Sequence, residues 1–165
     1  MADYTEKLTD AKAMGFIDQV GDVFKGLPHL PANIVEILVK IAPWLALLGG
    51  VLGLLAGPLV GVLGSIGSVL ALSPYAMFVT IVETVVMVAN AVLLLMAFSP
   101  LKAKAMRGWV FLFWSEMLSG ADIVLSLLQG RVGSLVGGVL GIAIGLYILF
   151  EIRSSYSGSA KAKTE

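Results

Sequence analysis

The chain has 165 residues and a mass of 17.3 kDa; 58% of its residues are hydrophobic, 13% are charged, and the mean hydropathy is +0.96. Soluble domains have about a quarter of their residues charged, so this composition excludes a water-soluble globule and predicts an all-α integral membrane protein. The formal net charge of zero argues against a nucleic-acid partner, and the lack of cysteines excludes disulfides, thiolate metal sites and cysteine nucleophiles.

Residues 1–30 have the pattern of an amphipathic helix that lies at a membrane interface. Apolar residues recur at helical spacing from Tyr4 to Phe24, and acidic and basic residues occupy the positions between them. The segment is too polar to span a bilayer, and its mixed charge favours docking on protein or in the headgroup zone. Pro28 and Pro31 should end the helix, because proline lacks a backbone donor and restricts the residue before it.

We predict a four-helix transmembrane bundle over residues 31–153, with spans at about 41–72, 76–98, 108–128 and 132–152. The last three are close to the required length of about 20 residues. The first is about 48 Å long as a helix, so we expect it to be tilted or kinked at Pro58 and to project beyond the bilayer. Ser99 and Pro100 should close the second span. Residues 154–165 are expected to form a polar C-terminal tail.

The basic residues support a count of four spans. With four, Arg131 lies alone on one side of the membrane, and ten of the 11 basic residues lie on the other: Lys7, Lys12, Lys25, Lys40, Lys102, Lys104, Arg107, Arg153, Lys161 and Lys163. The positive-inside rule then places both termini in the cytosol, stroma or matrix. The organelle stays open, with endomembranes and thylakoids as alternatives.

Two spans carry glycine at strict four-residue spacing. The first span has Gly49, Gly53, Gly57 and Gly61, and the fourth has Gly133, Gly137, Gly141 and Gly145. This spacing places small residues on one helix face, where they let two helix backbones approach closely in lipid. We expect the first and fourth spans to pack together through these faces, with a partner subunit or self-association as the alternative.

Three acidic residues fall inside the second and third spans and are the main clue to function. From their depths we expect two polar layers, Glu83 with Asp122 and Asn90 with Glu116. Asp122 also belongs to a polar stripe of Ser115, Ser119, Asp122 and Ser126. The residues can act as interhelical hydrogen-bond donors and acceptors, as a proton or cation pathway, or as ligands to a metal or to the magnesium of a chlorophyll.

His29 and the aromatic residues that open the third span are not expected to form a site. With no second histidine and no cysteine, His29 should be solvated or hydrogen-bonded rather than a metal ligand. The aromatic cluster consists of Trp109, Phe111, Phe113 and Trp114. Such a cluster at the end of a span predicts a belt at the membrane interface.

The last two spans resemble the COPI-associated family of small four-span membrane proteins. The features that carry the resemblance are the basic loop, Arg107-Gly108-Trp109 at the start of an aromatic third span, and the glycine-spaced fourth span that ends Gly145-Leu146-Tyr147-Ile148-Leu149. The resemblance implies a four-helix protein of endomembranes and carries over no site residues.

The predicted function is that of a non-enzymatic accessory or scaffold subunit of a larger membrane complex. The spans contain no nucleophile with a histidine, and no phosphate-binding glycine loop follows a strand. The expected partners are the lipid bilayer and other membrane subunits, or a second copy of the chain. No catalytic residue, metal site or resident cofactor is predicted; bound lipid is expected. The alternatives are a small proton or cation transporter and a chlorophyll-binding photosystem subunit.

Overall fold

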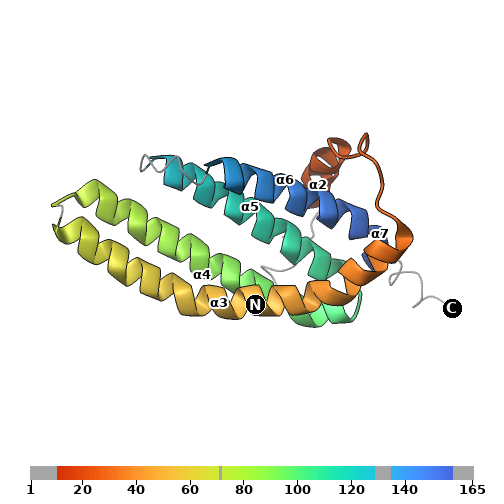
Figure 1. Ribbon diagram of the computed structural model, residues 1–165, viewed down its shortest axis with the longest axis horizontal. Helices are drawn as coiled ribbons and strands as arrows, with labels where there is room; N and C mark the ends of the chain where they lie inside the picture. Colours follow the sequence, from red (N-terminus) through yellow and green to blue (C-terminus); the bar gives the residue numbers. More distant parts are fainter. Residues whose placement is uncertain (1–10, 71, 129–134, 158–165) are drawn as a thin grey trace.

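The structure is a computed structural model that describes residues 11–70, 72–128 and 135–157, and these residues form helices and short connections (Figure 1). The helices are α2 (Ala11–Asp22), α3 (Ala32–Leu70), α4 (Pro74–Lys102), α5 (Met106–Leu128), α6 (Leu135–Ile152) and α7 (Ser154–Ser157). Four of them, α3 to α6, are long and apolar enough to cross a membrane. The prediction of an all-helical chain with four such helices is therefore confirmed.

The four long helices form two stacked hairpins, α3 with α4 and α5 with α6, and α4 packs on both α3 and α5. We refer to the end that carries the α4–α5 turn, at residues 103–105, as the inner end, and to the opposite end as the outer end. Figure 1 shows α3 and α6 far apart at the outer end and converging toward α7 at the inner end. Near the outer end, the Tyr75 hydroxyl donates a hydrogen bond to the Leu128 carbonyl at 3.1 Å, which joins α4 to α5.

The first long helix begins ahead of the predicted span at residue 41 and continues through both of its prolines. It has 39 residues, with Pro43 and Pro58 both inside it. At 1.5 Å per residue its length is about 58 Å, roughly twice the thickness of a hydrocarbon core. The α3–α4 hairpin accordingly reaches beyond the outer ends of α5 and α6 (Figure 1).

The second long helix does not close at Ser99 and Pro100; that prediction is wrong. It runs on to Lys102 with Pro100 in its last turn. A proline there removes only one backbone bond, and the carbonyls of the final turn find donors beyond the helix. The Ala103 amide donates to the Ser99 carbonyl at 3.1 Å and the Ala105 amide to the Pro100 carbonyl at 2.9 Å.

The apolar core lies at the inner end, where the first turns of α5 are enclosed by the other helices. Trp109 and Phe113 are fully buried and Phe111 is 1% exposed, so the prediction of an interfacial aromatic belt is wrong for these three residues. The Trp109 indole also donates a hydrogen bond to the Leu149 carbonyl of α6 at 2.6 Å. Only Trp114 in this cluster is partly exposed.

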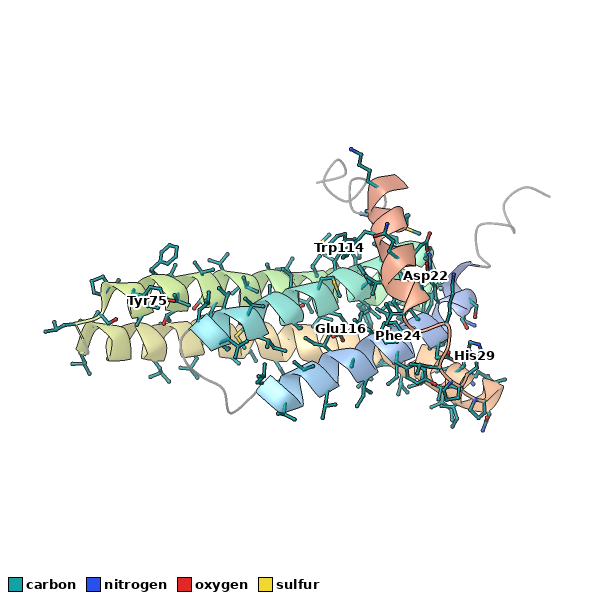
Figure 2. All side chains as sticks on the ribbon, turned by 90° about the horizontal axis from the view of Figure 1, so that it is seen from above. Asp22, Phe24, His29, Tyr75, Trp114 and Glu116 are labelled. Atoms are coloured by element: carbon teal, nitrogen blue, oxygen red, sulfur yellow. The ribbon has the colours of Figure 1, made fainter. Side chains whose placement is uncertain are left out.

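The N-terminal helix α2 lies across the inner end of the bundle (Figure 2). Ile17 is fully buried, and the Phe16 ring packs on Phe113 and Trp114 with centroids 6.1 and 6.2 Å apart. The Arg153 guanidinium donates to the Asp18 carboxylate at 2.7 Å. Within the described residues, α2 is therefore docked on protein.

The beginning of the predicted polar tail is also packed against the bundle. Residues 154–157 form α7, and Tyr156 is only 1% exposed. Burial disfavours the charged phenolate and raises the pKa of Tyr156 above its ordinary value. The rest of the predicted tail, residues 158–165, lies outside the described residues.

Candidate functional site

The glycine face of α3 packs on α4, not on α6 as predicted. A Cβ atom added to any of these four glycines would lie within 3.5 Å of an α4 side chain: Gly49, Gly53, Gly57 and Gly61. At Gly61 the added atom would be 2.5 Å from the Thr84 hydroxyl. All four glycines of this face therefore take part in the close packing of α3 on α4. Helices in lipid depend on such close contact, because lipid offers no hydrophobic force that would hold them together.

The glycine face of α6 is used only at its inner end. A Cβ atom added to Gly145 would lie 2.7 Å from the Glu116 carboxyl, whereas one added to Gly137 or Gly141 would meet nothing within 4 Å. Gly133 lies outside the described residues. Because α3 and α6 diverge toward the outer end, two glycines of α6 face open space within the described chain.

A polar seam joins α4 to α5 through the predicted serine stripe. The Ser115 hydroxyl donates to Asn90 Oδ1 at 2.5 Å, and Asn90 Nδ2 donates to the Ser119 hydroxyl at 3.3 Å. Ser119 also donates to the carbonyl of Ser115 at 3.1 Å. Both polar groups of the Asn90 amide therefore have partners on the neighbouring helix, where an unsatisfied amide would be costly.

Glu83 and Asp122 line one cavity toward the outer end of the same seam. The cavity has a volume of about 170 Å³, and Thr80, Thr84 and Ser126 also line it. The structure thus places together the two acidic residues that were predicted to share a layer. Two acidic residues in one small cavity with hydroxyl-bearing neighbours can exchange protons or bind a small cation.

The predicted pairing of Asn90 with Glu116 is wrong. Glu116 lies on the side of α5 that faces α6, next to Gly145, and it lines a separate cavity of about 240 Å³ between the four long helices. Ser115 and Glu116 are neighbours in sequence, so their side chains leave the helix about 100° apart and cannot both face α4. Figure 2 shows Glu116 within the bundle, far from Tyr75.

The polar seam stops before it reaches the inner end. Beyond Ser115 the contacts between α4 and α5 are apolar, with Ala97, Leu101 and Val110 each at most 1% exposed. In this conformation the buried core separates the two-carboxyl cavity from the inner surface. The described residues thus contain an outer polar seam closed by an inner apolar plug.

A second group of polar contacts fixes the connection between α2 and α3 to the end of α6. His29 Nδ1 lies 2.9 Å from Glu151 Oε1, and the Leu30 amide donates to Glu151 Oε2 at 2.8 Å. The Tyr147 hydroxyl donates to the Pro28 carbonyl. His29 is therefore hydrogen-bonded. Its partner Glu151 was not predicted from the sequence, in which the only signal was an acidic residue at the end of an apolar span.

In the described ranges, no three His, Cys, Asp or Glu side chains lie close enough together to hold a metal ion. The polar features of the site are therefore the seam with its two-carboxyl cavity, the Glu116 cavity and the His29–Glu151 contact. No protein-family model, no curated protein and no solved structure matches the chain.

Proposed function

We propose that the protein is a non-enzymatic integral membrane subunit that serves as a scaffold or accessory component of a larger membrane complex. The observation that carries this proposal is the open glycine face of α6. Glycine costs a helix about 1 kcal/mol relative to alanine in water, and on α3 close packing offsets this cost. Gly137 and Gly141 have no such contact within the described chain. A helix of another subunit, or of a second copy, would give these glycines a close-packed neighbour.

The position of the open face supports a partner helix, because none of the described helices packs on it. Gly137, Gly141 and Gly145 follow each other at four-residue spacing, and Gly145 and Ile148 line the cavity that α6 shares with α3. The open glycines therefore continue the face that α6 turns toward α3, at a level where α3 has moved away (Figure 1). In this proposal a helix of another subunit packs on the open glycine face of α6.

The proposed orientation places both termini on the cytosolic, stromal or matrix side. Helices α2 and α7 both lie at the inner end, together with Lys102 in the last turn of α4 and Lys104 in the α4–α5 turn. An even number of spans and this cluster of basic residues support the orientation. The resemblance to the COPI-associated family, and with it an endomembrane location, stays a prediction.

Enlarging the open glycines should release the protein from its complex without unfolding it. We expect Gly137→Leu and Gly141→Leu to shift the tagged protein to a smaller species when native membranes are extracted in mild detergent and separated by native electrophoresis. Ala143→Leu is the matched control, because Ala143 is exposed and lies about 200° around α6 from Gly141. Equal migration of all three variants and the wild type would contradict the proposal.

A second candidate function is proton or cation transport, which the shared cavity of Glu83 and Asp122 favours. This function requires the apolar plug at the inner end to open. If it operates, Glu83→Gln or Asp122→Asn abolishes flux into liposomes that contain the purified protein, whereas Glu116→Gln, in the other cavity, leaves it unchanged. We expect instead no flux above that of empty liposomes for the wild type, because hydrogen bonding between helices accounts for the seam. Flux that depends on Glu83 would replace the scaffold proposal.

A further inference from the structure

The Glu116 cavity, between the four long helices, has a volume of about 240 Å³ and mostly apolar walls. An apolar cavity of about 150 Å³ in a protein interior binds benzene, so this one has room for a ligand of about ten non-hydrogen atoms. Its lining on α6 runs from Gly145 to Ile152, which is about 10 Å at 1.5 Å per residue. The cavity therefore suits a small, elongated, largely hydrocarbon ligand.

Among the described residues that line this cavity, Glu116 is the one that can ionise, and its carboxyl lies at the Gly145 end. A Cβ atom added to Gly145 would lie 2.7 Å from Oε1 and 3.2 Å from Oε2 of Glu116, so glycine leaves the carboxyl its place against α6. Within the described parts of the chain, Glu116 forms no hydrogen bond or ion pair. A carboxyl group without a partner in these ranges thus stands at one end of an apolar cavity.

The chemistry of this carboxyl favours an amine as the ligand. A lipid chain would fill the cavity but leave the carboxyl without a partner, which is costly at the depth of a bilayer. A neutral amine that enters from the membrane can accept the carboxyl proton on its nitrogen. The resulting ammonium and carboxylate attract each other strongly among apolar side chains, and no bare cation has to leave water to form the pair. A hydroxyl group would form only a weaker, uncharged hydrogen bond with the protonated carboxyl.

We propose that this cavity binds a small lipophilic amine, with its nitrogen paired to the Glu116 carboxyl and its hydrocarbon body extended along α6 toward Ile152. The site is separate from the open glycines of α6 and from the cavity of Glu83 and Asp122. Binding here requires neither a partner helix nor a transport function.

The test compares an amine with the alcohol of the same shape. Phenylpropylamine and phenylpropanol each have about ten non-hydrogen atoms, the number that the cavity should hold. Isothermal titration calorimetry measures their binding to the full-length protein in phosphatidylcholine nanodiscs, and titration of empty nanodiscs corrects for partition into lipid. The wild type should bind the amine saturably and more tightly than the alcohol. Glu116→Gln should weaken amine binding about tenfold or more, as expected for loss of a charged hydrogen-bond partner, and change alcohol binding little.

Glu83→Gln is the matched control, because it removes the same carboxyl group from the other cavity. It should keep the wild-type affinity for the amine. Equal losses in Glu83→Gln and Glu116→Gln would overturn the proposal. So would a wild type that binds the amine no more tightly than the alcohol, or that shows no saturable binding beyond that of empty nanodiscs.

The position of the hydrocarbon body is tested by filling the cavity. Ala42 lines the cavity, so Ala42→Phe should abolish binding of the amine. Leu48→Phe should not, because Leu48 is 56% exposed and lies outside the cavity. Circular dichroism checks that both variants are folded. Unchanged amine affinity in folded Ala42→Phe would exclude the ligand from this cavity. The Glu116→Gln comparison decides the amine contact even where Ala42→Phe does not fold.

Discussion

Replacing Trp109 with alanine should destabilise the bundle by about 3–5 kcal/mol, the range for removal of a large buried aromatic side chain. Trp109 is fully buried in the bundle, with an exposed fraction of 0%. Its ring packs on Phe113 and Phe150 at 5.9 and 5.5 Å between centroids, and its indole donates to the Leu149 carbonyl. The change therefore removes packing and a hydrogen bond that join α5 to α6.

The measurement is an SDS titration in mixed micelles, followed by far-ultraviolet circular dichroism so that the lost indole does not change the signal. Trp44→Ala is the control, because Trp44 is 57% exposed and its removal should cost less than about 1 kcal/mol. If the two tryptophan variants unfold at the same SDS fraction, the inner core is not the centre of stability.

Replacing Gly108 with alanine should also weaken the bundle, by about 1–3 kcal/mol, which is the cost of forcing an extra methyl group into a packed site. An added Cβ would lie 2.6 Å from the Leu101 amide nitrogen and 2.9 Å from the Pro100 carbonyl carbon. These are backbone atoms, so rotation of a side chain cannot make room. The start of α5 would have to move away from the end of α4.

Gly120→Ala, on the same helix, should have the opposite effect. The added Cβ would lie 3.8 Å from the Ile142 side chain, which is an ordinary van der Waals contact. Alanine is the better helix former by up to about 1 kcal/mol, so this variant should be as stable as the wild type or more stable. The same SDS titration compares the two. Stability losses of equal size would contradict the close approach at Gly108.

The helices could be predicted from sequence because each apolar run is long enough to identify a span by length and composition alone. Their ends were less predictable where contacts beyond the helix decide them. Pro100 is a strong signal for a helix end, yet α4 accommodates it in the last turn. Trp109 shows a second limit: lipid and a packed protein interior are both apolar, so an aromatic residue at the end of a span is compatible with either.

The level of each site residue along the bundle could be predicted from the sequence, but the side of the helix on which its side chain lies could be predicted only in part. Counting residues from the α4–α5 turn placed Glu83 level with Asp122, and these residues line one cavity. The same count placed Asn90 level with Glu116, but Glu116 faces α6 and Asn90 instead meets the serine stripe. Glycine spacing likewise defines one face of a helix but does not identify the helix that packs on it. The glycine face of α3 packs on α4, whereas the predicted neighbour was α6.

The most direct test of the scaffold proposal is site-specific photo-cross-linking in native membranes. A benzophenone amino acid is placed at Ile144, which is 57% exposed and one turn from Gly141, or at Val139, which is 52% exposed on the opposite side of α6. We predict a protein adduct, either another subunit or a second copy, from position 144 and none from position 139. Absence of a protein adduct at 144, or equal adducts at both positions, would contradict the role of this face in assembly.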